Sequence, residues 1–326
     1  MIFPDYLKEN DLIGVTACSS GILKKLDKYE MSVNNFKKNG FRIIETDNVR
    51  TNGVVSSSNV DRAEQLHSLF TNDEVKLISI ASGGDFLYDM LDLVDFDLIR
   101  NNVKWIAGSS DPTSLLFIIT TNLDIATFYT PCNMSGFDMN TLHESLVNYM
   151  KIICGEHVKQ LKYDMYELEE DKNIDGYNLA WKNEWINING NVDESGVLIG
   201  GCIECLKDVI GTKFDKTNDF IEKYKDEGII WYFDVFNMTS EGLYNTLLQF
   251  KNAEWFKYAK AILIGKVKYP NTFTDMSYEE LISKAIDIPC VFNFDVGHVK
   301  PSFTMINGAK VRVVSNDEEG SLEFIR

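Results

Sequence analysis

The 326-residue sequence lacks the marks of several specialised classes of protein. No apolar run approaches the roughly 20 residues that a membrane-spanning helix needs, so we expect no membrane partner. The segment from Met1 to Glu9 has neither the basic start nor the apolar stretch of a signal peptide, which predicts a cytoplasmic protein. Acidic residues outnumber basic ones by 49 to 32, and no basic stripe interrupts this excess, so nucleic acid is disfavoured as a partner.

Cysteines are few and scattered through apolar surroundings, which is typical of free thiols in a reducing compartment. Only Cys202 and Cys205 have C-x-x-C spacing. Because no second pair and no nearby histidine accompanies them, we expect no metal site. The stretch at 200–206 is better explained as a loop that opens a helix.

The chain does contain enough apolar sequence for two packed domains. Hydrophobic residues make up 44% of it and aromatic residues 12%, as in a globular protein. In the first half, short apolar runs alternate with helical patterns, which predicts a parallel sheet covered by helices. The strands predicted there lie at 12–17, 41–45, 75–80 and 103–107, and the helices at 32–39 and 61–70.

A polar, acidic and aromatic stretch separates the two halves of the chain. We therefore expect an N-terminal α/β domain at 1–155, a linker at 156–190 and a smaller C-terminal α/β domain at 191–326. The strands predicted in the last lie at 196–199, 229–233, 261–265, 290–294, 310–314 and 321–325, with helices after 201 and at 240–250 and 279–285. Functional loops of such sheets lie at the carboxyl ends of strands, so residues that directly follow a strand are candidates.

The turn Gly108-Ser109-Ser110-Asp111 lies between an apolar strand and a helix opened by Pro112. A serine at this edge of a sheet faces the N–H groups of the helix, which can stabilise an oxyanion. Proline suits the first helical position, and Asp111 suits the N-cap. Because Pro112 replaces the last glycine of G-x-S-x-G, a standard α/β-hydrolase is disfavoured. Helix capping alone would give the same pattern, so Ser110 is a candidate nucleophile that needs partners.

A nucleophilic serine needs a base, and the sequence has four histidines. His67, His143 and His157 lie in or beside helical stretches, where solvated or capping histidines are common. His298 follows Gly297 in a loop directly after an apolar strand, which makes it the candidate base. A loop histidine bonded to a backbone carbonyl would give the same pattern.

A carboxylate that orients the imidazole and donors for an oxyanion complete such a site. Asp234 directly follows the apolar run at 229–233 and is the candidate carboxylate, although aspartate is also common at turns. The donors are expected at Ser82-Gly83-Gly84-Asp85, where paired glycines let the backbone approach a ligand. A tight strand-to-helix turn would also use these glycines.

In this order, the motifs resemble those of the cytoplasmic LD-carboxypeptidases and the related microcin C immunity peptidases. The resemblance covers residues from about 11 to 315 and rests on Ser82 to Asp85, Gly108 to Thr113, Gly228 to Asp234, and Gly297-His298 followed by Asn307-Gly308. It implies a Rossmann-like N-terminal domain of the class I glutamine-amidotransferase type, a smaller C-terminal α/β domain, and a homodimer.

The resemblance also implies a Ser-Glu-His triad that needs no cofactor. By position, Ser110 would be the nucleophile and His298 the base, while N–H groups of Asp111 and of Gly83 or Gly84 would form the oxyanion hole. The acid falls on Asp234, which departs from the family because its pattern has glutamate there. Because aspartate is one methylene shorter, the backbone or the imidazole must move by about an ångström to keep the contact. The orientation of the triad, and therefore the catalytic rate, depends on this movement.

Two features favour the microcin immunity branch. Residue 82 is serine where tetrapeptide-recycling members have arginine, and the segment at 240–266 also resembles that branch. Its members cleave an amide next to an acidic residue that carries an aminoacyl nucleotide, so a small peptide or peptidyl-nucleotide is the implied substrate. Trp181 and Trp185 would stack on a purine, and Asp85 is a further substrate-binding candidate. Linker tryptophans also pack domain interfaces.

We therefore predict a two-domain serine peptidase that hydrolyses an amide near a free carboxylate. One alternative is a murein-tetrapeptide LD-carboxypeptidase of cell-wall recycling. Another is a non-catalytic ligand-binding protein with the same fold, which the aspartate at position 234 supports. A glutamine-amidotransferase-like enzyme is disfavoured because its nucleophile is a cysteine, whereas this turn carries Ser110.

Overall fold

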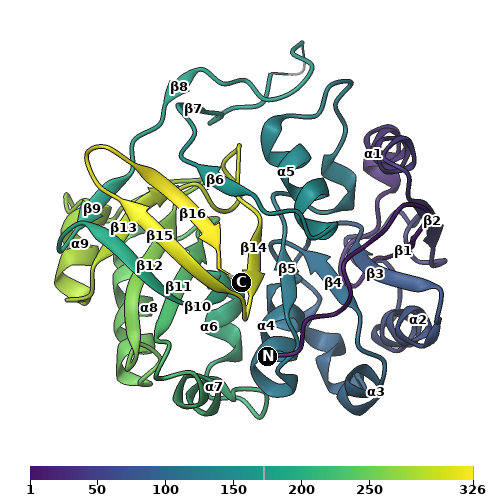
Figure 1. Ribbon diagram of the computed structural model, residues 1–326, viewed down its shortest axis with the longest axis horizontal. Helices are drawn as coiled ribbons and strands as arrows, with labels where there is room; N and C mark the ends of the chain where they lie inside the picture. The colour runs from purple at the N-terminus through teal and green to yellow at the C-terminus, as the bar shows by residue number, and fades with distance from the viewer. Residues whose placement is uncertain (172, 326) are drawn as a thin grey trace.

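In the computed structural model, which describes residues 1–171 and 173–325, the first half of the chain surrounds a largely parallel sheet (Figure 1). Its strand order is β14-β5-β4-β3-β1-β2, and only the β14–β5 pair is antiparallel. The strands are β1 Leu12–Thr16, β2 Arg42–Glu45, β3 Val75–Ile80, β4 Trp105–Gly108, β5 Thr127–Tyr129 and β14 Met305–Asn307. The alternation predicted from the sequence is confirmed, and β3 has the predicted bounds.

Helices cover both faces of this sheet, because successive strand residues point to opposite sides and both sides are apolar. Buried residues of α1 and α5 pack in one core cluster, and those of α2, α3 and α4 in the other. The helices are α1 Leu26–Lys38, α2 Asn59–Thr71, α3 Phe96–Asn101, α4 Thr113–Leu123 and α5 Glu144–Ile153, with 3₁₀ turns η1 Leu23–Lys25, η2 Tyr88–Leu93 and η3 Met134–Gly136.

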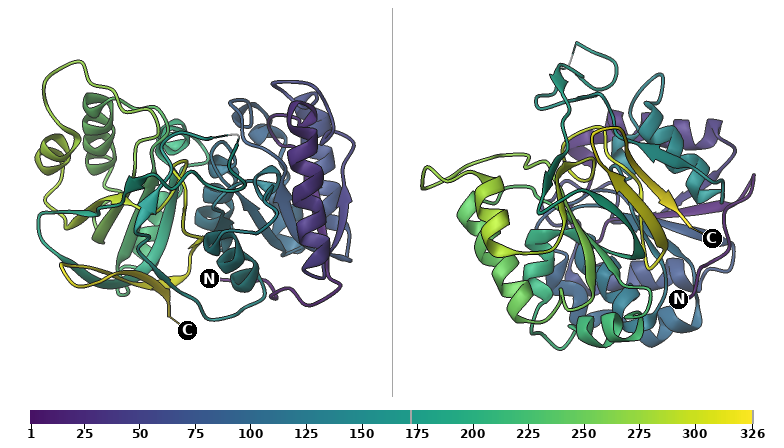
Figure 2. Two further views of the ribbon diagram at one scale, coloured as in Figure 1. Left: turned by 90° about the horizontal axis from the view of Figure 1, so that it is seen from above. Right: turned by 60° about the vertical axis from the view of Figure 1, so that its left-hand side comes forward.

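The second domain stands beside the first, as Figure 2 shows with its green and yellow segments next to the purple and blue ones. Its sheet has the order β6-β16-β15-β10-β11-β12-β13-β9 and is parallel from β10 to β13. The strands are β6 Lys159–Leu161, β9 Ile186–Ile188, β10 Val192–Cys202, β11 Ile229–Asp234, β12 Ala259–Gly265, β13 Cys290–Phe294, β15 Lys310–Ser315 and β16 Gly320–Phe324. Among the described residues this sheet has eight strands against six, so the domain predicted to be smaller holds the larger sheet.

The helices of the second domain are α6 Ile203–Val209, α7 Thr217–Lys223, α8 Ser240–Asn252 and α9 Tyr278–Ala285. Strand β10 runs directly into α6, so the loop predicted at 200–206 is wrong: the apolar strand continues to Cys202 because it is buried on both faces. Of the helices in the described residues, none is both long enough and apolar enough to cross a membrane.

The segment predicted as a linker, 156–190, contains strands of its own. Strand β6 pairs with β16 and β9 pairs with β13, so both ends of the segment extend the second sheet. Between them, β7 Met165–Tyr166 and β8 Trp181–Lys182 form a small antiparallel ribbon, which lies at the top of Figure 1.

Two elements join the domains. The late strand β14 pairs with β5, so a segment near the C-terminus completes the N-terminal sheet. Helix α4 is apolar on almost every side, as expected of a helix buried all round, and contacts α6, α7 and β10 of the second domain. Its Phe117 stacks on Trp255, with ring centroids 5.5 Å apart, and Trp255 stacks on Trp231 at the same spacing.

Asn307, at the end of β14, bonds to both domains and gives a test of this junction. Its buried Oδ1 accepts hydrogen bonds from Gly200 N at 3.1 Å and Tyr232 Oη at 2.9 Å. Because Asn307→Ala leaves two buried donors unpaired, we expect the free energy of unfolding to fall by about 2 to 4 kcal/mol in urea denaturation. The exposed Asn52→Ala should cost less than about 0.5 kcal/mol, and equal losses in the two variants would contradict this role.

Candidate active site

Three strand ends from the two domains meet at one cleft. Ser110 follows β4 of the first domain, Asp234 is the last residue of β11, and His298 lies in the loop after β13. Parallel strands present their carboxyl ends at one edge of a sheet, and here the two sheets turn these edges toward each other. The structure thus brings together the three residues that the sequence proposed as nucleophile, acid and base.

The turn that carries Ser110 is held in a strained conformation. Ser110 has a φ of +68°, in the left-handed region that costs a non-glycine residue about 1 to 2 kcal/mol. The amide of Asn133 holds the preceding residue, since Ser109 N donates to its Oδ1 at 2.9 Å and its Nδ2 donates to Ser109 O at 3.0 Å. Strain of this kind is typical of functional sites, where the surroundings impose it.

The side chains of Ser110, His298 and Asp234 form a continuous hydrogen-bonded chain. His298 Nε2 lies 3.0 Å from Ser110 Oγ. On the other side of the ring, Nδ1 lies 3.0 Å from Oδ1 and 2.8 Å from Oδ2 of Asp234. This is the order of contacts through which a carboxylate orients an imidazole and the imidazole accepts the serine proton.

The carboxylate of Asp234 reaches the imidazole because the backbone of the loop that carries His298 approaches the carboxylate closely. His298 N donates to Asp234 Oδ1 at 3.0 Å. Gly297 has a φ of +111°, and a Cβ at this position would collide with the same carboxylate oxygen. Glycine therefore permits the close approach that offsets the short side chain of Asp234.

Asp234 is buried, but its surroundings favour the ionised carboxylate. Burial alone would raise the pKa of its carboxyl group. The neighbouring His298 and hydrogen bonds from His298 and Tyr129 more than offset this, so the pKa lies below the ordinary value. An ionised carboxylate is the form that stabilises a developing imidazolium.

Some backbone N–H groups near Ser110 are hydrogen-bonded within the protein, and others are not. Ser110 N donates to Tyr129 Oη at 3.1 Å. In contrast, the N–H groups of Gly84 and Asp111 have no acceptor in the described part of the chain. Gly83 lies against Ser110, because a Cβ there would be 3.4 Å from Ser110 Oγ.

The side chain of Asp111 does not cap helix α4, so that prediction is wrong. Pro112 occupies the cap position, and Asp111 turns its carboxylate inward, where Oδ2 accepts from Leu87 N at 3.0 Å. Burial raises the pKa of this carboxyl group, although hydrogen bonds from Ser19 and Leu87 oppose the rise. Asp111 thereby ties the glycine-containing loop to the nucleophile turn.

The cleft that Ser110 and His298 line has a volume of about 1050 Å³. Gly83 and Gly84 also line it. Its walls carry charges of both signs, with lysines from η1 and α1 and acids from the β7–β8 segment: Lys24, Lys25, Lys28, Glu167, Glu170, Asp171 and Asp175. Lys28 crosses between these groups, with Nζ 2.8 Å from Glu170 Oε1.

The proposed substrate contacts Trp181, Trp185 and Asp85 are absent from the lining of this cleft among the described residues. Trp185 packs on Phe294 at a centroid distance of 4.4 Å, and its Nε1 donates to Asp295 Oδ2 at 3.1 Å. Trp181 lies in the β7–β8 ribbon beside Tyr166. The two indoles are thus engaged in packing, and Asp85 is exposed beside the glycine turn.

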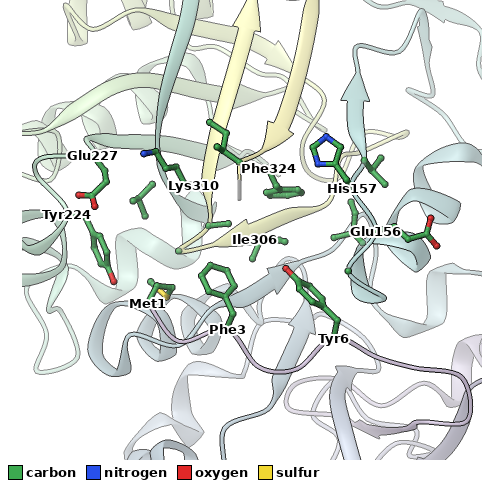
Figure 3. A pocket seen from close by; sticks show the side chains of 17 residues that line it. Met1, Phe3, Tyr6, Glu156, His157, Tyr224, Glu227, Ile306, Lys310 and Phe324 are labelled. Carbon is green, nitrogen blue, oxygen red and sulfur yellow. The ribbon is translucent and has the colours of Figure 1, made fainter.

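A second cavity, of about 470 Å³, has a lining of its own (Figure 3). Apolar side chains of both domains line it, among them Met1, Phe3, Ile306 and Phe324. It contains none of Ser110, Asp234 and His298, so the charged cleft is the candidate active site.

Two residues of the site were not foreseen from the sequence. Tyr129 contacts Ser110 and Asp234, and Asn133 holds Ser109. Tyr129 directly ends the short strand β5, so the rule that strand ends carry function could have found it. Asn133 lies in a loop beyond Pro131 and gives no comparable signal.

Most of the chain matches the models of one protein family. The model of the LD-carboxypeptidase N-terminal domain matches residues 13–130, and that of the C-terminal domain matches residues 195–313. The chain belongs to the LD-carboxypeptidase family. It is therefore a serine-type carboxypeptidase or amide hydrolase, as predicted.

Two branches of the LD-carboxypeptidase family are among its relatives. The microcin C7 self-immunity protein MccF of Escherichia coli is 24% identical over 94% of this chain and 91% of its own. The structure of MccF in complex with aspartyl sulfamoyl adenosine has a TM-score of 0.83 at 20% identity and covers 100% of this chain and 99% of that one. The structure of muramoyltetrapeptide carboxypeptidase from Oxalobacter formigenes has a TM-score of 0.74 at 18% identity and covers 97% of this chain and 99% of that one.

Gly297 offers a test of the site that needs no substrate. We expect Gly297→Ala to lower the rate at which a fluorophosphonate labels Ser110 by about 100-fold, because the new methyl group displaces the Asp234 carboxylate. Gly211→Ala is the matched control, since Gly211 also has a positive φ, of +73°, but no atom lies near its Cβ position. Both variants bear the backbone cost of about 1 to 2 kcal/mol, and similar labelling rates would contradict the assignment.

Proposed function

We propose that Ser110, His298 and Asp234 form the catalytic triad of this LD-carboxypeptidase family member. His298 Nε2 takes the proton of Ser110 Oγ as the oxygen bonds to the amide carbonyl carbon, and then gives it to the leaving amine. The same nitrogen then deprotonates a water molecule, whose oxygen bonds to the acyl carbon. As the ester bond to Ser110 Oγ breaks, the nitrogen returns the proton to Oγ and the acyl group leaves as a carboxylic acid. The 3.0 Å contact between Nε2 and Oγ is the observation that carries this proposal.

We propose that the oxyanion forms against the backbone. The proposed donors are the N–H of Asp111, which directly follows Ser110, and an N–H of Gly83 or Gly84, which line the same cleft as Ser110. Donors fixed in a folded backbone need no reorganisation as negative charge develops, which is why they stabilise the transition state strongly.

For the substrate, we propose an aminoacyl nucleotide in which the scissile amide lies next to a carboxylate. MccF, whose fold this chain shares, is known in complexes with aspartyl sulfamoyl adenosine and glutamyl sulfamoyl guanosine. The cleft of about 1050 Å³ has room for a ligand of that size. Lys24 and Lys25 on its wall favour the anionic groups of such a ligand.

A murein tetrapeptide is the second candidate substrate. It is favoured by the fold shared with muramoyltetrapeptide carboxypeptidase and by the family to which the chain belongs. The cleft also suits a peptide, since the acids of its far wall can meet a free amino group.

We further propose a cytoplasmic homodimer, in keeping with the resemblance to the family. Light scattering of the purified protein gives the mass in solution, and twice the chain mass of 37.2 kDa is the expected value.

The substrate is tested by giving aspartyl sulfamoyl adenosine and a murein tetrapeptide to the wild type and to Ser110→Ala. We expect the wild type to cleave the nucleotide, and the variant to lose activity by about 1,000-fold or more, because the nucleophile is missing. Cleavage of the tetrapeptide alone would assign the protein to cell-wall recycling. Binding of the nucleotide without cleavage by wild type would favour a ligand-binding protein, and full activity of Ser110→Ala would refute the triad.

The lysine wall is tested by the double variant Lys24→Gln/Lys25→Gln. We expect KM for the aminoacyl nucleotide to rise about 5-fold, which corresponds to the loss of one solvent-screened charge contact. The rate of labelling by a fluorophosphonate should stay unchanged, because Ser110 is untouched. Lys37→Gln/Lys38→Gln, at the other end of α1, is the matched control for net charge, and an equal rise in KM there would contradict a local role.

A further inference from the structure

Tyr129 contacts both ends of the proposed triad. It ends β5 of the first domain, and its side chain is fully buried. Its hydroxyl group lies between Ser110 N, at 3.1 Å, and Oδ2 of Asp234, with which it forms a short hydrogen bond. One phenol therefore connects the backbone of the nucleophile to the carboxylate of the other domain.

The direction of these two hydrogen bonds follows from the groups themselves. A backbone N–H can only donate, so the phenol oxygen accepts from Ser110. The single phenol proton is then directed to the carboxylate, which accepts. Burial, together with the nearby Asp234 anion, raises the pKa of Tyr129 well above its ordinary value, so the phenol keeps that proton.

These contacts have two consequences. First, the bond to Ser110 N fixes the strained backbone at φ +68° and leaves the oxyanion to the other N–H groups of the cleft. Second, the bond to Oδ2 draws negative charge away from the carboxylate, both of whose oxygens lie within 3.0 Å of His298 Nδ1. The more charge Tyr129 draws, the less the carboxylate stabilises an imidazolium.

We propose that Tyr129 is a positioning residue, which holds Ser110 and Asp234 in register across the domain junction and sets the pH at which the serine becomes reactive. The inference rests on the triad proposed above but not on the identity of the substrate. It also accounts for how a buried aspartate carboxylate is satisfied: Oδ1 accepts from His298 N, and Oδ2 accepts from Tyr129 and also lies 2.8 Å from His298 Nδ1.

Other ionisable groups face this pair. Cys202 lies opposite Asp234 in the register of β10 and β11. Tyr232 packs on Tyr129 with centroids 5.6 Å apart, and the half-buried Lys300 donates to Gly297 O at 2.9 Å. None of these groups is altered in the variants below apart from Tyr232 in the control, so a change in pH dependence reports on the phenol.

The test measures the second-order rate of labelling of Ser110 by a fluorophosphonate as a function of pH. We expect Tyr129→Phe to slow labelling by about 10- to 100-fold, because the nucleophile loses its backbone acceptor. The acid limb of the profile should move to higher pH, because the carboxylate regains its full charge and holds the imidazolium more strongly. Tyr232→Phe is the matched control: it removes another buried tyrosine hydroxyl, which donates to Asn307 Oδ1 at 2.9 Å, and should leave the acid limb in place.

A second substitution, Tyr129→3-fluorotyrosine, keeps the hydroxyl group and the fold. Fluorine makes the phenol a stronger donor, so the acid limb should move to lower pH, opposite to the shift in Tyr129→Phe. Unchanged acid limbs in both variants, or a shift equal to that of Tyr232→Phe, would overturn the inference. If wild type is not labelled at Ser110, the triad itself fails, and if it is labelled but cleaves neither candidate substrate, only the proposed substrate fails.

Discussion

The hydrogen bond between Tyr129 and Asp234 is the contact on which the cleft depends, because it joins two buried groups from separate domains. A buried carboxylate that lacks a partner costs several kcal/mol. Asp234 obtains its partners only when β5 of one sheet and the loop after β13 of the other meet at β11. The ionised state of Asp234 therefore depends on the alignment of the two domains, and this alignment also places His298 beside Ser110.

The helix that begins after Ser110 makes this alignment rigid. Helix α4 is buried on nearly every side, and its Phe117 continues the stack of Trp255 and Trp231 in the second domain. Core packing resists small displacements because side chains interdigitate at crystal-like density. The turn that carries Ser110 is thus attached to a helix buried on nearly every side, although the turn itself lines the cleft.

Much of this arrangement could be predicted from the sequence, because apolar runs that end in Ser, Gly or Asp mark strand ends, and strand ends of parallel sheets converge. That reasoning located Ser110, Asp234 and His298, which the structure brings into contact. The same reasoning did not identify Tyr129, because a tyrosine in an apolar run resembles any aromatic residue of the core. The family resemblance predicts a ligand contact at Trp185, whereas its ring packs against Phe294, which lies on a strand distant in sequence. The contact of β14 with β5 is equally non-local.

The pairing of β14 with β5 has a consequence for biosynthesis. Residues Met305–Asn307 leave the ribosome long after the rest of the N-terminal sheet, so that sheet exposes an unpaired edge at β5 while some 175 residues are still being made. During the first part of this time, Ser110 is present without Asp234 and His298, its partners in the proposed triad. Until β14 is made, the nascent chain carries an open strand edge at β5 that can be captured by a chaperone or by another nascent chain.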